Sequence, residues 1–112
     1  MRGSETDVQA STRMPPAEDI RAEFSAGAAH GYGRLLDISA EGLFVRSALL
    51  PPRGPVHVVL RTPTGREIRV AGEVRWNTAG KRFRASGFGV RLSGTGRDYN
   101  ALLARARELN RI

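Results

Sequence analysis

Three residues at a fixed spacing, Asp37, Ser39 and Gly42, form a D-x-S-x-x-G segment whose side chains can make specific hydrogen bonds. The carboxylate and the hydroxyl can accept hydrogen bonds from nearby backbone N–H groups, and the glycine can supply a positive φ. These properties predict a tight turn between two strands, which accounts for the spacing without any ligand. A ligand site at the same turn is the other interpretation, and the residues alone leave both open.

A second group of chemically capable residues is the sequence Lys81-Arg82-Phe83-Arg84, in which three cations surround one aromatic residue and no acid lies nearby. One interpretation is a solvated hairpin tip with Phe83 folded back onto the protein. The other is a tip that binds an anion or a partner protein, because clustered cations attract negatively charged surfaces.

The chain has 112 residues, with 18 basic and 11 acidic side chains and a net charge of +7. Such an excess favours a polyanionic partner, for example nucleic acid, an anionic membrane or a phosphorylated ligand. Residues 53–91 contain nine basic and two acidic residues, whereas the rest of the chain contains nine of each. We expect this charge to lie away from the Asp37 turn and to mark a second surface centred on residues 81–84.

The residue patterns of common catalytic and metal sites are missing from the sequence. It has no cysteine, its two histidines (His30 and His57) lack metal-ligand spacing, and it has no G-x-S-x-G segment or Walker-type glycine loop. No apolar run approaches the roughly 18 residues of a membrane span, and the N-terminus lacks the apolar part of a signal peptide. We therefore predict a non-catalytic, cytoplasmic protein without a metal centre and without membrane insertion.

The elements that must position these residues are mainly short strands. Residues 1–17 are polar and end near two prolines, which predicts a flexible N-terminal arm before a single domain over 18–112. In that domain, apolar and polar residues alternate in about six segments, roughly 8 to 12 residues apart, the pattern of an antiparallel barrel or sandwich. The longest alternation has one face that we expect to point into the core, formed by Ile68, Val70, Gly72, Val74 and Trp76.

The periodicity changes from that of a strand to that of a helix after residue 94. Thr95 and Asp98 have the spacing of a capping box, and apolar residues at helical spacing follow, which predicts a helix over about 96–110. The apolar stripe consists of Tyr99, Leu102, Leu103, Ala106 and Leu109. We expect this helix to pack through its leucines as a lid over one end of the strands.

Three segments and the terminal helix together carry a resemblance to a known family. The segments are Asp37–Gly42, Gly72-Glu73-Val74-Arg75-Trp76 and Gly87-Phe88-Gly89-Val90-Arg91-Leu92. In this order and spacing the chain resembles the PilZ domain, the bacterial receptor module for cyclic di-GMP, over about residues 13–110. The resemblance implies an all-β fold, a six-stranded antiparallel β-barrel with a C-terminal α-helix.

The resemblance also implies which residues face cyclic di-GMP. In the family, a turn with Asp or Asn at its first position, D/N-x-S-x-x-G, faces the dinucleotide, and an R-x-x-x-R motif in the N-terminal arm contacts its other side. Asp37, Ser39 and Gly42 match the turn, and Arg13 matches the second arginine, but Gln9 occupies the position of the first. Arginine forks pair with phosphates and guanine edges. The loss of one fork should weaken binding roughly 10- to 100-fold.

Three functions are consistent with these residues. A cyclic di-GMP effector would bind the nucleotide between the arm and the turn, with an affinity that the missing arginine weakens or abolishes. A degenerate PilZ-like adaptor would need no nucleotide and would act by contact with a partner protein. A basic β-barrel that binds nucleic acid is disfavoured, because most aromatic residues fall on expected core faces and leave no stacking platform. No cofactor is expected; cyclic di-GMP is the candidate ligand.

Overall fold

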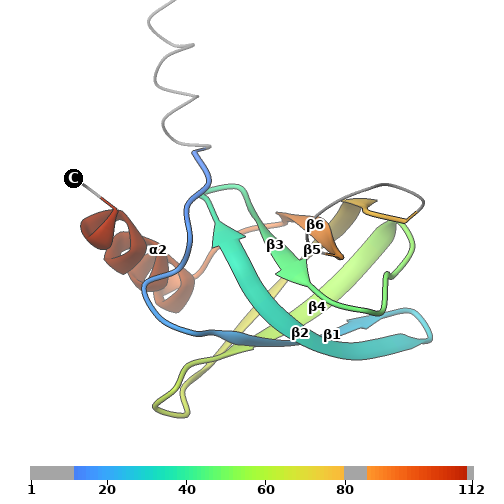
Figure 1. Ribbon diagram of the computed structural model, residues 1–112, viewed down its shortest axis with the longest axis horizontal. Helices are drawn as coiled ribbons and strands as arrows, with labels where there is room; N and C mark the ends of the chain where they lie inside the picture. The colour runs from blue at the N-terminus through green and yellow to red at the C-terminus, as the bar shows by residue number, and fades with distance from the viewer. Residues whose placement is uncertain (1–11, 80–85, 111–112) are drawn as a thin grey trace, which may run out of the picture.

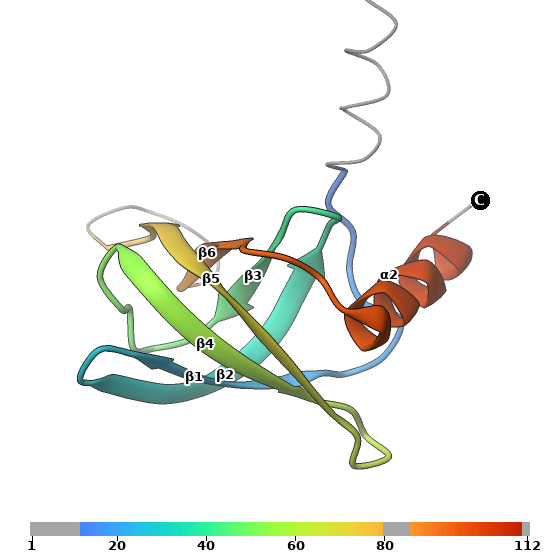
Figure 2. The same ribbon diagram turned by 180° about the vertical axis from the view of Figure 1, so that it is seen from behind.

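The computed structural model describes residues 12–79 and 86–110, and these residues form a closed barrel of six antiparallel strands with one helix (Figures 1 and 2). The strands are neighbours in the order β1-β2-β3-β6-β5-β4, and β4 pairs with β1 to close the barrel. The elements are β1 (Arg21–Ala26), β2 (Ala29–Ile38), β3 (Gly42–Arg46), β4 (Gly54–Arg61), β5 (Glu67–Asn77), β6 (Gly87–Leu92) and α2 (Arg97–Leu109). This architecture confirms the expected all-β barrel with a C-terminal helix.

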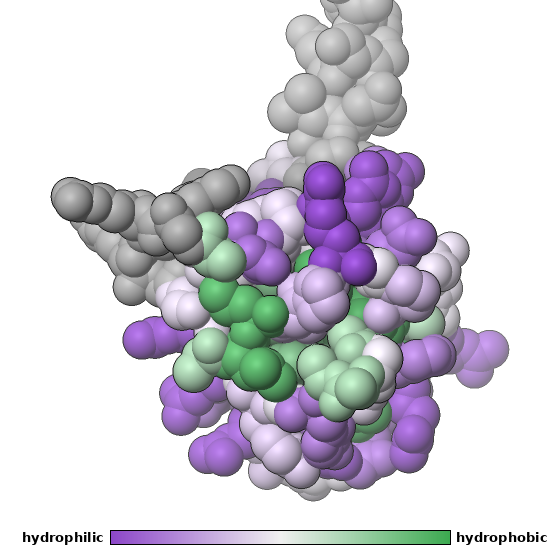
Figure 3. All heavy atoms as spheres, turned by 90° about the vertical axis from the view of Figure 1, so that its right-hand side faces the viewer, coloured by the Kyte–Doolittle hydropathy of each residue, from purple (hydrophilic) through white to green (hydrophobic). Residues whose placement is uncertain are grey.

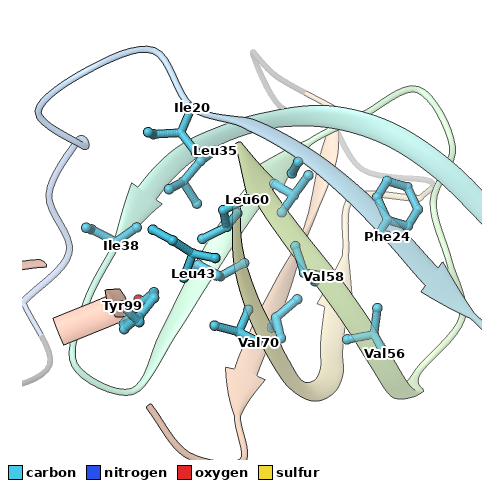
Figure 4. Close-up of a cluster of buried hydrophobic side chains, with 14 of the residues drawn as sticks. Ile20, Phe24, Leu35, Ile38, Leu43, Val56, Val58, Leu60, Val70 and Tyr99 are labelled. Carbon is cyan, nitrogen blue, oxygen red and sulfur yellow. The ribbon is translucent and has the colours of Figure 1, made fainter. Parts of the chain in front are cut away.

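The core is built from alternate side chains that point inward from the strands (Figure 4). Successive side chains of a strand point to opposite faces, so in β1 Ala22 and Phe24 are buried while Arg21 and Ser25 are exposed. Phe24 packs edge-to-face on Phe88 of β6, with 4.7 Å between the ring centroids. Because β1 and β6 are not neighbours in the sheet, this contact joins opposite walls of the barrel.

Helix α2 lies at one end of the barrel, as Figures 1 and 2 show, and it packs there through an apolar stripe. The buried members of the stripe are Tyr99, Leu102, Leu103 and Ala106. Leu109, expected in the same stripe, is instead 61% exposed, because it lies in the last turn of the helix. The expected capping box is also wrong: Gly96 is the N-cap and makes no side-chain cap hydrogen bond, while Asp98 pairs with Arg66 at 3.1 Å.

The outer surface of the barrel is largely hydrophilic, with local apolar exposure. Figure 3 looks onto the end opposite α2 and shows a group of apolar residues bordered by hydrophilic ones. Tyr32 and Leu36 of β2 and Leu49 of the β3–β4 loop are exposed large hydrophobic residues. Within the described residues, none of the helical structure has the length and apolar character needed to cross a membrane.

Candidate functional site

The described part of the N-terminal arm lies against the end of β2 and brings Arg13 to Asp37. Met14 N donates to Ile38 O (3.0 Å), and Ile38 N donates to Met14 O (2.8 Å), so the two residues form a short antiparallel bridge. Beside this bridge, Arg13 Nη1 donates to Asp37 Oδ1 at 3.1 Å. Two candidate residues that are far apart in the sequence therefore form an ion pair.

Asp37 lies on the outer face of the barrel because the pairing of β2 with β3 is irregular between Leu35 and Asp37. This irregularity places Asp37 opposite Phe44. Burial raises the pKa of the Asp37 carboxyl above its ordinary value, and the charge and hydrogen bond of Arg13 oppose this rise. A carboxylate that has lost part of its hydration benefits from further N–H donors. Asp37 is therefore well suited to accept hydrogen bonds from a ligand.

Ser39 holds the turn between β2 and β3 from within. Its Oγ accepts hydrogen bonds from Glu41 N (3.3 Å) and Gly42 N (3.2 Å), and its backbone N donates to Gly42 O (2.9 Å). The residue is only 4% exposed. These contacts form the tight turn that the spacing predicts, and they give the hydroxyl a structural role within it.

Gly42 is needed at this turn for a reason that differs from the expected one. Its φ is not positive; in the described chain, positive φ occurs at Gly27, Gly54 and Gly65. A Cβ at Gly42 would instead overlap the carbonyl oxygen of Val90 on the neighbouring strand β6. Glycine is required here because the two backbones approach closely.

Tyr99 of helix α2 supports the turn from the inside of the barrel. Its hydroxyl donates to Ser39 O at 2.8 Å and lies 3.2 Å from Gly42 O, so one proton is shared between two carbonyls of the turn. Figure 4 shows Tyr99 near Ile38 and Leu43, at the same end of the core. Burial raises the pKa of Tyr99 above its ordinary range, which keeps the hydroxyl protonated and able to donate.

The same helix also contacts the arm. Asn110 Nδ2 donates to Pro15 O at 3.3 Å, and Arg105 Nη2 lies 3.8 Å from Glu18 Oε1. Helix α2 therefore contacts both of the segments that the sequence analysis assigned to the ligand: the turn, through Tyr99, and the arm, through its last turns.

A hollow of about 280 Å³, here called the turn hollow, opens beside the turn and is lined by residues from the arm, the turn, β5 and β6. Arg13, Ser39 and Gly42 line it, as do Arg75 of β5 and Arg91 of β6. The expectation that the charge of residues 53–91 lies away from the turn is therefore wrong for these two arginines. Strand β3 pairs with β6, and β6 with β5, so Arg91 lies opposite Gly42 in the sheet.

Trp76 forms an aromatic wall of the turn hollow. It was expected on the core face, but the pairing of β5 with β6 shifts between Val74 and Trp76, so the indole lies on the outer face over Gly89. A Cβ at Gly89 would overlap the indole nitrogen. Phe44 stacks on Trp76 with 5.3 Å between centroids and 27° between the ring planes. Glycine at position 89 therefore leaves room for the indole ring of Trp76 from the neighbouring strand β5.

Comparison with known protein families identifies one family for this chain. The PilZ domain family matches residues 7–107, almost the whole chain. This chain belongs to the PilZ family. A solved structure of the Bacillus subtilis inhibitor of motility (MotI/DgrA) is similar to this PilZ domain, with a TM-score of 0.67 and 20% identity over 89% of this chain and 51% of that one. This PilZ domain thus spans about half of that protein, and the likeness concerns the fold. No curated protein sequence matches significantly.

PilZ domains are in general non-catalytic modules that bind cyclic di-GMP and protein partners. In this PilZ domain, the structure brings Arg13, Ser39 and Gly42 to one hollow and joins Asp37 to it through Arg13. The predicted partner-binding residues Lys81, Arg82, Phe83 and Arg84 lie outside the described residues.

Sequence reasoning did not identify Arg75, Trp76 and Arg91 as site residues. The segments that contain them contributed to the resemblance only through their order and spacing along the chain. What was missing was the adjacency of β3 and β6, a long-range pairing that local periodicity does not reveal.

Proposed function

We propose that this PilZ domain binds cyclic di-GMP at the turn hollow and acts as a non-catalytic signalling module. The observation that carries the proposal is that three arginines, Arg13, Arg75 and Arg91, line one hollow beside the D-x-S-x-x-G turn. Cyclic di-GMP carries two phosphates and two guanines. A hollow lined by several arginines and an indole, with the Asp37 carboxylate paired to one of those arginines, offers partners for each of these groups.

Each residue has a role that follows from its chemistry. The arginines are donors for phosphate oxygens and for guanine O6 and N7. The partly desolvated carboxylate of Asp37 is an acceptor for the N–H groups of a guanine edge, and Trp76 offers an apolar ring for stacking. Ser39 and Gly42 act indirectly, since they fix the turn and allow β6 to approach it.

The arm has glutamine in place of its first motif arginine, and Arg75 and Arg91 supply an alternative source of positive charge. Neither of these two arginines forms an ion pair with an acidic side chain among the described residues. Their charge is therefore not neutralised by a described carboxylate. This arrangement favours retained nucleotide binding over complete loss.

A nucleotide-independent adaptor is the second candidate function, and one observation favours it. The polar groups of the turn already have partners within the protein: Asp37 binds Arg13, and the Ser39 hydroxyl binds the Glu41 and Gly42 amides. Packing alone can therefore preserve this turn, so its presence does not require a ligand. In this case the module would act only by protein–protein contact.

Calorimetric titration of the purified protein with cyclic di-GMP tests the proposal. We expect binding at about micromolar concentrations, weakened roughly 10- to 100-fold by Asp37→Ala, Arg13→Ala or Arg91→Ala, since each removes a charged hydrogen-bonding partner. Arg97→Ala is the matched control, because Arg97 is exposed on α2 and does not line the turn hollow.

Two outcomes would contradict receptor function. The first is absence of binding at about 100 µM nucleotide, which corresponds to less than about 5.5 kcal/mol of binding free energy and would support the adaptor. The second is binding that the three site variants and the Arg97 control weaken equally, which would show attraction to net charge rather than to the turn hollow.

A further inference from the structure

Four arginines form a continuous row across one side of the barrel, apart from the turn hollow. In the registers of the sheet, Arg61 of β4 lies opposite Arg21 of β1, Arg21 lies opposite Arg34 of β2, and Arg34 lies opposite Arg46 of β3. Neighbouring strands lie about 4.8 Å apart, so each side chain has a cation next to it. Like charges that lie directly opposite each other destabilise a sheet.

The charge of this row is neutralised at one end only. Arg61 pairs with Glu23 (2.7 Å) and Glu67 (3.1 Å). Arg34 has a single distant contact, 3.7 Å to Asp19, in which both side chains are more than half exposed. Among the described residues, no acidic side chain pairs with Arg46 or Arg21. Positive charge therefore remains where β2 meets β3.

A second hollow, of about 540 Å³, opens at this uncompensated end. Arg34 and Arg46 line it together with Tyr32 and the residues Ser47 and Ser86. It shares no lining residue with the turn hollow. Two guanidiniums and nearby hydroxyls form a set of donors suited to carboxylate oxygens.

Exposed large hydrophobic side chains flank Arg34 along β2. Tyr32 is 67% exposed and Leu36 is 40% exposed, at positions two residues before and two residues after Arg34. Tyrosine and arginine are enriched among the residues that dominate binding energy in protein interfaces. An exposed tyrosine, arginine and leucine along one strand therefore have the composition of a protein-docking surface.

We propose that Tyr32, Arg34, Leu36 and Arg46, here called the β2–β3 face, dock an acidic segment of a partner protein. Charge complementarity selects carboxylates for Arg34 and Arg46, and the exposed ring and leucine offer contacts for apolar side chains of the same segment. A nucleic acid backbone is polar and charged, so it offers no apolar side chain to pack against the exposed Leu36. The proposal does not depend on cyclic di-GMP, because the two hollows have no lining residue in common.

The test is an NMR titration of the isotope-labelled full chain with a synthetic peptide of Glu-Asp-Leu repeats at low salt. We expect the amide shifts to concentrate on residues 32–36 and 46–48. We expect the double variant Arg34→Ala/Arg46→Ala to weaken peptide binding about tenfold or more, and Tyr32→Ala to weaken it without any change in charge. The matched control is Arg97→Ala/Arg107→Ala, which removes the same charge from exposed positions of α2.

Three results would overturn the proposal: no shifts at the β2–β3 face, equal loss in both double variants, or stronger shifts at this face with inorganic phosphate or a single-stranded oligonucleotide than with the peptide. The cyclic di-GMP titration of Arg34→Ala/Arg46→Ala keeps the two proposals apart. That variant should bind nucleotide as the wild type does. A loss of peptide binding with unchanged nucleotide binding assigns the effect to the β2–β3 face.

Discussion

The replacement Tyr99→Phe tests whether helix α2 holds the D-x-S-x-x-G turn in place. The change removes one hydroxyl and keeps the buried ring, so packing in the core should be preserved. The lost group donates to Ser39 O at 2.8 Å and lies 3.2 Å from Gly42 O. Gly42 O retains the Ser39 amide as a donor, whereas Ser39 O loses its buried hydroxyl partner.

The expected cost follows from this geometry. A buried hydrogen bond contributes about 1 kcal/mol net, and a buried acceptor left without a donor costs about 1–3 kcal/mol. We therefore expect Tyr99→Phe to lower the free energy of unfolding by about 1–3 kcal/mol, which for a domain of this size lowers Tm by roughly 4–8 °C per kcal/mol. Because the turn loses its support, cyclic di-GMP binding should also weaken.

Urea denaturation and amide exchange at residues 39–42 measure these two effects. Tyr32→Phe is the matched control, since it removes a hydroxyl from the other tyrosine of the chain, which is 67% exposed, and should change stability by less than about 0.5 kcal/mol. The reasoning is refuted if Tyr99→Phe leaves both unfolding and turn exchange at wild-type values, because the hydroxyl would then have no role in fixing the turn.

Three further predictions concern the same site. Gly42→Ala should destabilise the protein by about 1–3 kcal/mol in chemical denaturation, because the added methyl overlaps Val90 O. Burial raises the pKa of the Asp37 carboxyl above its ordinary value of about 3.9, so cyclic di-GMP affinity should fall as the pH drops through that raised pKa and the carboxylate becomes protonated. Calorimetry at constant ionic strength from about pH 7 to 4 measures this fall. An affinity that does not change with pH would exclude the ionised carboxylate as an acceptor. Gly89→Ala should displace Trp76, the single tryptophan, and shift its fluorescence, whereas an unchanged spectrum would contradict the close packing.

Local periodicity predicted about six strands in a barrel or a sandwich, because alternation in each strand depends only on which face is buried. The resemblance to the PilZ domain then selected the six-stranded barrel, which the structure has. Periodicity failed at Trp76, where one irregular pair moves the ring to the opposite face of the sheet. Similarly, the sequence showed that Gly42 belongs to a turn but not why, since its constraint comes from Val90 on a strand that is distant in sequence.

The distribution of charge along the sequence likewise did not predict which charged residues lie together in the fold. Counting residues located the excess in residues 53–91, yet position along the chain did not reveal that Arg75 and Arg91 lie beside Ser39. Their placement depends on the adjacency of β3, β6 and β5, which is a property of topology. Net charge by segment is therefore a weak guide to function in a closed barrel, where every strand has two neighbours.

Helix α2 contacts the turn through Tyr99 and the arm through Asn110 and Arg105. The same contacts therefore hold the helix on the barrel and fix the two segments that border the turn hollow. Thermodynamic linkage makes such coupling reciprocal. If nucleotide binding changes the affinity of α2 for the barrel by some factor, a protein that captures α2 must change nucleotide affinity by the same factor. A signal would then leave this domain as a competition for helix α2 between the barrel and a partner protein.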